Sequence, residues 1–298
     1  MKKKLKVLAA FIILAGTAAA FIQYASTHPA LLDKLRQTNP LILIILVSAY
    51  IVWFLALVVI LRISIRMYGI SISKQENMLL NAYSSLANFF GPGQSGPAVR
   101  GLYLKKRHGL AIKKYLFASL IYYGFYAFFS AFLLLAGSQA WWVTTIALLV
   151  VGSTSFTILR WYARRTTQNV ESGISARAIG WIAAATAIQI FTQAFIFLIE
   201  LRQIDQTISL AQAFSYTGAA NFAVFVSLTP GAIGIREAFL VFSQNIHGIG
   251  NTIMVAANVI DRAVYLLFLG VLFGLVVGLH AKDKLRITQY LGQAREHH

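Results

Sequence analysis

Long apolar runs, separated by short polar segments, make up most of this chain. Six of them approach or exceed the about 20 residues that cross the hydrocarbon core of a bilayer. They cover residues 7–24, 41–61, 115–136, 141–159, 178–199 and 252–279. The polar segments are too short to hold a second globular unit. The pattern predicts an all-α integral membrane protein with about six transmembrane helices, organised as one polytopic domain over residues 1–298.

The composition agrees with this class. Hydrophobic residues make up 58% of the chain and charged residues only 12%, against about 25% charged in a soluble domain. There is no cysteine, which excludes disulfides, thiolate metal sites and cysteine nucleophiles. The net charge of +17 could suggest nucleic acid. In a membrane protein the positive-inside bias explains it better, so we expect no nucleic-acid partner.

The first apolar run follows Met1 and four lysines, and so it is similar to a signal peptide. No clear small-residue cleavage site precedes a polar mature domain, and the second apolar run follows almost at once. We therefore predict a retained first helix.

Basic residues divide the loops into two sets. Most of the 26 lysines and arginines fall near the N-terminus, in segments 62–74, 100–114 and 160–177, and near the C-terminus. Lys34, Arg36 and Arg202 lie in the opposite set of loops. The positive-inside rule then places both termini in the cytoplasm, in a multi-pass protein of the plasma (inner) membrane.

This division has a topological consequence. Segments 62–76 and 100–114 are both basic, so residues 77–99 must enter and leave the membrane from the cytoplasm. By the same reasoning residues 211–245 re-enter from outside. Two re-entrant helical hairpins of opposite orientation indicate an inverted repeat, with halves at about 62–140 and 200–280.

A repeated phrase marks the two hairpins. Each contains Pro-Gly-x-x-Gly followed by an arginine, which is Arg100 in the first and Arg236 in the second. The predicted turn residues are Pro92, Gly93 and Gly96, and Pro230, Gly231 and Gly234. Helix breakers at corresponding positions of two halves are typical of a transporter-like binding site.

Local signals predict where the hairpin helices begin. Ser73 and Glu76 have the spacing of a capping box, and Gly69 just before them suits a turn. Ser209 and Gln212 have the same spacing in the second hairpin.

The broken helices point to an anion site. Unpaired backbone groups cannot face lipid, so such segments line a cavity or lie within protein. Helix N-termini and the arginine fork both suit phosphate. We expect Arg100 and Arg236 to bind a lipid head group. Arg100 adjoins a basic loop, so it can equally be a snorkelling residue. Arg236 lies in an apolar stretch, which favours a functional role for it.

Three further charges complete the candidate site. Glu237 adjoins Arg236, and Asp261 and Arg262 open the last run. They can balance one another if the hairpin packs on the last helix. A purely structural ion pair is the alternative. We find no catalytic constellation, metal motif or cofactor motif, so we expect neither an enzyme nor a cofactor or metal.

The second hairpin carries a family resemblance. Residues 227–238, with Pro230, Gly231, Gly234, Arg236 and Glu237, resemble the hallmark of the lysylphosphatidylglycerol synthase transmembrane-region family. The first hairpin is similar to that family's upstream counterpart, and Asp261-Arg262 is similar to the start of its last core helix. Residue 232 is Ala where the family often has Gly.

The resemblance implies a flippase-type membrane domain. Well-known members join it to an aminoacyltransferase domain and are associated with flipping aminoacylated phosphatidylglycerol; no such domain follows here, so we do not expect lipid synthesis. We expect a lipid flippase or transporter for a phosphate-bearing phospho- or glycolipid. The expected partners are membrane lipids, either anionic phospholipid or lipid-linked phosphate. The alternative is a non-catalytic membrane partner of a lipid-modifying glycosyltransferase or aminoacyltransferase, and a homo-oligomer is compatible with either. An intramembrane enzyme fits least.

Overall fold

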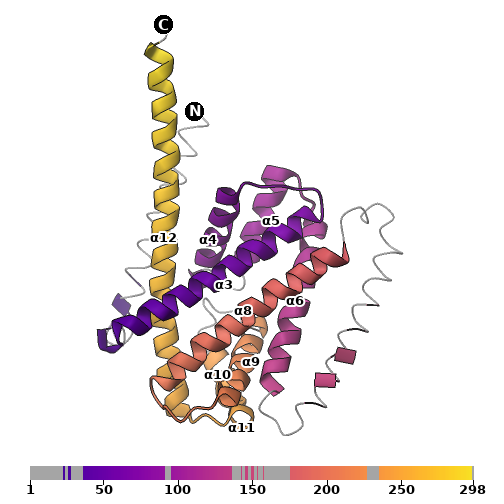
Figure 1. Cartoon of the computed structure of the whole chain (residues 1–298), viewed down its shortest axis with the longest axis vertical. Helices are drawn as coiled ribbons and strands as arrows, with labels where there is room; N and C mark the ends of the chain where they lie inside the picture. Colours follow the sequence, from indigo (N-terminus) through magenta and orange to yellow (C-terminus); the bar gives the residue numbers. More distant parts are fainter. Residues whose placement is uncertain are drawn as a thin grey trace.

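The computed structural model describes residues 36–90, 95–135, 175–226 and 235–296, with a few single positions elsewhere. Every regular element in these ranges is a helix (Figure 1). The predicted first run at 7–24 and the run at 141–159 lie almost wholly outside the described residues.

Four of the described helices are long and apolar enough to cross a membrane. They are α3 (Pro40–Arg66), α6 (Ile112–Leu135), α8 (Ala176–Arg202) and the part of α12 (Asn251–Glu296) that spans Asn251–Leu279. These helices coincide with four of the six predicted spans. The protein is therefore an all-helical, multi-pass membrane protein in the part of the chain that the structure describes.

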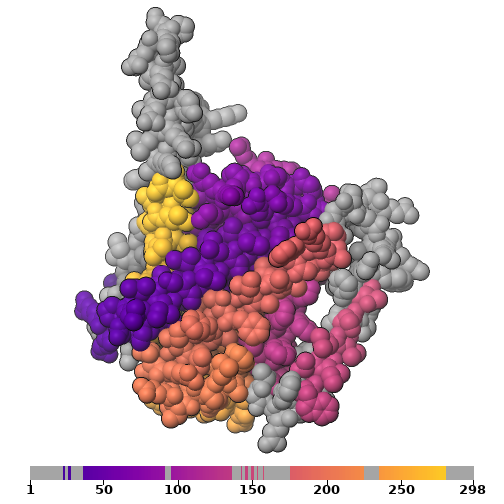
Figure 2. Space-filling view, in the orientation of Figure 1, coloured from indigo at the N-terminus to yellow at the C-terminus, as the bar shows by residue number. Residues whose placement is uncertain are grey.

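Helices α3 and α8 pack side by side and cross the molecule diagonally, with α12 beside them (Figure 1). In the space-filling view they form two adjoining bands across one face (Figure 2). Their inner sides join α9 and α12 in one apolar core that includes Leu46, Ile196, Tyr216 and Phe268. Several large apolar side chains of α3, such as Leu41, Ile44 and Val52, are exposed, as expected for a surface that faces lipid.

The two predicted hairpins appear as broken helical segments. Helix α4 (Lys74–Phe90) packs on α5 (Ser95–His108), and α9 (Leu210–Val226) packs on α10 (Ile235–Phe242), which α11 (Gln244–His247) follows. Neither segment is one continuous helix. Figure 1 shows α4 and α5 toward one end of the molecule and α9 to α11 toward the other.

The predicted turns are only partly described. Pro92, Gly93, Pro230, Gly231 and Gly234 lie outside the described residues. Gly96 lies buried in the first turn of α5, not in the connection.

Two glycines allow helices of these segments to approach closely. A Cβ atom on Gly96 would lie 2.6 Å from the Ser84 carbonyl oxygen of α4, and one on Gly218 would lie 2.5 Å from the Ser130 carbonyl oxygen of α6. Real Cβ atoms do not tolerate such distances. The lack of a side chain therefore brings α5 onto α4 and α9 onto α6.

The predicted capping signals are found at both helix starts. The Glu76 amide donates to Ser73 Oγ at 3.0 Å, but the Glu76 carboxylate turns to other partners. At the second start the box is reciprocal, because the Ser209 amide donates to Gln212 Oε1 at 3.0 Å and the Gln212 amide donates to Ser209 Oγ at 3.2 Å. Gly69 has a positive φ of 72°, as a turn there requires.

Candidate functional site

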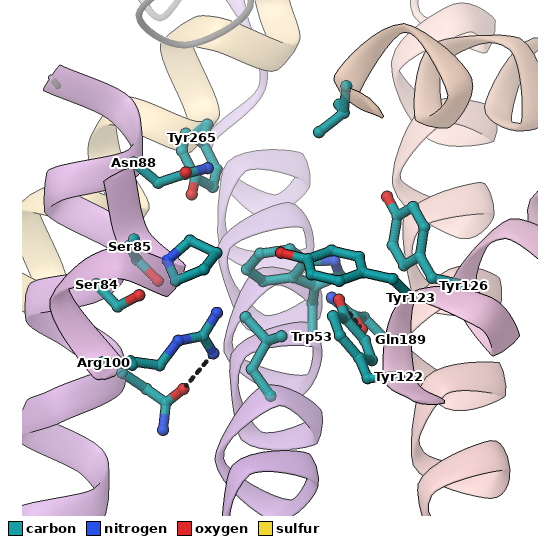
Figure 3. A pocket seen from close by; sticks show the side chains of 15 residues that line it. Trp53, Ser84, Ser85, Asn88, Arg100, Tyr122, Tyr123, Tyr126, Gln189 and Tyr265 are labelled. Carbon is teal, nitrogen blue, oxygen red and sulfur yellow. Dashed lines mark hydrogen bonds between the residues drawn. The ribbon is translucent and has the colours of Figure 1, made fainter. Parts of the chain in front are cut away.

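A cavity of about 100 Å³ lies beside the first broken segment, and Val224 of α9 is the one lining residue from the second. It is lined by the middle parts of all four apolar helices, through Trp53 of α3, Tyr122 of α6, Gln189 of α8 and Tyr265 of α12 (Figure 3). If these helices cross a bilayer, the cavity lies near its mid-plane. Its volume exceeds what one water molecule needs.

Helix α4 contributes a polar wall to the cavity. Asn81, Ser84, Ser85 and Asn88 line it, and their spacing places them on one face of the helix. Asn88 Oδ1 is buried and has no hydrogen-bond partner among the described residues. A helix at membrane depth rarely carries such a stripe unless it faces protein or a polar ligand.

Arg100 of α5 points into this cavity (Figure 3). Its Nη1 donates to Asn81 Oδ1 at 3.2 Å, which holds the guanidinium against the α4 wall. Its Nε is buried and has no partner among the described residues. The guanidinium therefore keeps donor capacity toward the cavity, and this is the capacity that a phosphate oxygen uses.

The opposite wall is aromatic with fixed polar tips. Tyr122 donates to Gln189 Oε1 at 3.1 Å, and Tyr126 donates to Asn221 Oδ1 at 2.9 Å. With Tyr123 they present rings toward the cavity from α6 (Figure 3). Such a wall combines apolar surface with hydroxyls, as a site for an amphiphile requires.

A second cluster lies where α10 meets α12. Arg236 Nη1 lies 2.6 Å from Asp261 Oδ2, and Asp261 also accepts a short hydrogen bond from Tyr50 of α3. The Arg236 guanidinium stacks over the Phe197 ring at 4.9 Å. Both ion-pair side chains are largely buried, so this pair is assembled inside the protein.

The residues that directly follow Arg236 and Asp261 in the sequence form a second ion pair. Arg262 Nη2 lies 2.6 Å from Glu237 Oε1, and Asn258 donates to the same oxygen. The packing of α10 on α12 thus gives two parallel ion pairs. Each of the four charges therefore has a partner of opposite sign in this cluster.

The cavity and the charged cluster are connected through aromatic side chains. Tyr265 lines the cavity one turn after Asp261 on α12. Its ring lies 5.1 Å from that of Tyr50, whose hydroxyl bonds Asp261. A shift of Asp261 can therefore move the Tyr265 ring in the cavity wall through direct contacts.

The structure separates the predicted site residues into two groups. Arg236, Glu237, Asp261 and Arg262 form one cluster, whereas Arg100 lies on the cavity and not among them. The two arginines of the repeated phrase therefore have different surroundings.

Sequence reasoning missed several residues. Glu200 lies fully buried near the charged cluster, and its signal was the single acid at the end of an apolar run. The polar face of α4 was also visible, as asparagines and serines at helical spacing. Gln189 and Tyr126 carried no signal that distinguishes them from ordinary core residues.

Comparison with protein families identifies the chain's relatives. The sequence profile described as "Lysylphosphatidylglycerol synthase TM region" matches residues 7–274. The chain belongs to this family. Membership associates it with a membrane domain linked to lysylphosphatidylglycerol synthesis or lipid flipping. Comparison with curated proteins gives no match.

Proposed function

We propose that this protein moves a phosphate-bearing lipid between the two leaflets of the plasma membrane. The observation that carries the proposal is the polar cavity at the middle of the four apolar helices, with the Arg100 guanidinium pointing into it. A lipid head group that crosses a bilayer needs a polar station at this depth, because a phosphate in hydrocarbon is otherwise very costly.

The arrangement of the broken segments supports the same function. In this proposal α4–α5 and α9–α10 are re-entrant hairpins of opposite orientation. The cavity lies against the first hairpin, and Val224 of the second also lines it. Arg100 binds the phosphate. The asparagine and serine side chains of α4 form hydrogen bonds with the head group, and the tyrosines of α6 contact the glycerol region. The Arg236–Asp261 and Glu237–Arg262 pairs hold the second hairpin on α12.

The test is a leaflet-exchange assay in reconstituted vesicles. Phosphatidylglycerol with a fluorophore on one acyl chain is placed in both leaflets, and a membrane-impermeant quencher reports lipid that reaches the outside. We expect the protein to speed exchange over empty vesicles, with and without an imposed pH gradient. Arg100→Gln should remove most of this acceleration, because the amide loses the charge and the fork.

Arg107→Gln is the matched control, since Arg107 lies on the same helix but is exposed. It should keep the wild-type rate. Full activity of a correctly inserted Arg100→Gln protein would contradict the assignment of Arg100. No acceleration by the wild type under any gradient would instead favour the alternative, a non-catalytic membrane partner of a lipid-modifying glycosyltransferase or aminoacyltransferase.

A further inference from the structure

The Glu200 side chain is a buried acid without a hydrogen-bond partner among the described residues. It is 0% exposed, and neither carboxylate oxygen has a hydrogen-bond partner among the described residues. Its charged neighbours are Asp261 and Arg236. A buried carboxylate that accepts no hydrogen bond loses its hydration without compensation, and this strongly favours the neutral acid.

The charges around Glu200 do not balance when every group is ionised. Glu237 is matched by Arg262 at 2.6 Å, and Asp261 is matched by Arg236 at 2.6 Å. Glu200 then remains as one negative charge without a cation of its own. A single proton bound at Glu200 makes the five-residue cluster neutral.

The other titratable groups around this cluster do not supply the missing positive charge. They come from each neighbouring element, and they are Tyr50 of α3, Tyr126 of α6, Tyr216 of α9 and His247 of α11. The tyrosines are neutral or negative, never positive.

His247 is held in its neutral form by its hydrogen bonds. Its Nδ1 accepts from the Ile249 amide at 3.1 Å, and its Nε2 donates to the Leu240 carbonyl oxygen at 3.0 Å. Nδ1 cannot carry a proton while it accepts this bond. Burial also lowers the pKa of His247 more than its bond to Leu240 raises it.

We propose that Glu200 is a proton-binding site, and that Glu200 and Asp261 compete for the single Arg236 guanidinium. With the proton on Glu200, Arg236 pairs with Asp261, as the structure shows. When Glu200 releases the proton, its carboxylate attracts Arg236 and weakens the pair with Asp261. Arg236 Nε and Nη2 are buried and make no hydrogen bond of good geometry in the described ranges, with the Tyr216 hydroxyl as their polar neighbour, so they can turn to this second partner.

The change of partner at Arg236 affects the cavity through Asp261. Asp261 accepts a hydrogen bond from Tyr50, the Tyr50 ring meets the Tyr265 ring edge to face, and Tyr265 lines the cavity. Proton binding would thus be linked to the shape of the cavity. The proton site stands on its own geometry, whereas its link to lipid movement rests on the proposed function.

Infrared difference spectroscopy tests the proton site without any transport assay. The purified protein in lipid is compared at neutral and alkaline pH, and the carbonyl stretch of a protonated carboxylic acid is followed with its shift in D₂O. We expect the wild type to show this band and Glu200→Gln to lack it. Glu237→Gln is the matched control and should keep it, because Glu237 is ionised beside Arg262.

Two results would overturn the proton site. One is a spectrum of Glu200→Gln that retains the wild-type band at every pH. The other is a Glu200→Gln protein that fails to fold, because the amide has the size and neutrality of the protonated acid. In the first case, loss of the retained band in Asp261→Asn would place the proton on Asp261.

The link to transport has a separate readout. In the leaflet-exchange assay the wild-type rate should change several-fold between acidic and alkaline pH, and the Glu200→Gln rate should be independent of pH. A Glu200→Gln rate that follows the wild-type pH profile would reject the link. Absence of wild-type exchange at any pH would reject the proposed function, while the infrared result would still decide the proton site.

Discussion

Arg236 and Asp261 lie 2.6 Å apart and join the short helix α10 to the last membrane span. The pair is almost wholly buried, and Arg236 also stacks on Phe197 while Asp261 also accepts from Tyr50. It thereby ties α3, α8, α10 and α12 together at one point. Ion pairs in such surroundings are costly to break, because the remaining partner keeps its charge without water.

Removal of either member of this pair should destabilise the protein. We expect Arg236→Gln to lower its stability by about 3–5 kcal/mol, the cost of an uncompensated buried charge, and Asp261→Asn to lower it by less, because Glu200 can then ionise beside Arg236. The double variant should recover part of this loss, since no charge of the pair is then left alone. Thermal unfolding in detergent measures all four proteins. Strictly additive losses in the double variant would show that the pair contributes no coupling.

The close approach of α5 to α4 predicts a sharp size limit at Gly96. A methyl group there would meet the Ser84 carbonyl and hydroxyl oxygens at 2.6 and 2.7 Å, so Gly96→Ala must push the helices apart. We expect a loss of about 1–3 kcal/mol, typical of overpacking. Lipid exchange should also fall, because Gly96 lines the cavity.

Gly124→Ala provides the control for this substitution. Gly124 lies on α6, and a Cβ atom there meets nothing within 4 Å. The variant should melt at or slightly above the wild-type temperature, because alanine favours a helix over glycine by about 1 kcal/mol. It should keep the wild-type exchange rate. Equal behaviour of the two alanine variants would mean that the α4–α5 contact does not limit residue size.

Much of the fold could be predicted because the bilayer imposes simple requirements on sequence. Hydropathy and length located α3, α6, α8 and the first part of α12. Side-chain spacing located the caps at Ser73 and Ser209. These signals are local, so a single sequence contains them.

The details of the site depend on how helices turn toward one another. Adjacent residues on a helix point about 100° apart, so Arg236 and Glu237 had to take different partners, but only packing decides which. The cavity could not be predicted for the same reason, since Arg100, Gln189 and Tyr265 come from three distant segments. Glu200 directly follows an apolar run in the sequence, and its burial became visible only in the folded chain.

A polar contact at the start of α4 should depend on pH. Glu76 accepts from Tyr103 at 2.6 Å and contacts His108 Nε2 at 2.7 Å. Burial raises the pKa of Glu76, but these bonds outweigh it and the pKa is lowered overall. Burial, followed by the bond to Glu76, raises the pKa of Tyr103 to about 12.

A lowered carboxyl pKa contributes stability above the unfolded-state pKa of Glu, about 4.3, and loses it as pH falls through the folded-state value. The melting temperature of Glu76→Gln should therefore be below that of the wild type at neutral pH, by an amount equivalent to less than about 1 kcal/mol. The difference should vanish in acid. Tyr103→Phe removes one hydrogen-bond donor to Glu76. In that background, Glu76→Gln should lower the melting temperature at neutral pH by less than it does in the wild type. A difference that grows on acidification would contradict the assigned role of Glu76.

The proposed orientation predicts which loops face the cytoplasm. The basic end of α5 and the exposed loop after α8 should lie on opposite sides, because positive charge stays inside. The chain has no cysteine of its own, so single cysteines report cleanly. We expect Lys105→Cys to be protected from an impermeant maleimide added to intact cells, and Gln206→Cys to react; both positions are exposed in the structure. Permeabilised cells, in which both should react, provide the control. Labelling of position 105 from outside would require α4 and α5 to enter from the other face and would reverse the proposed orientation of both hairpins.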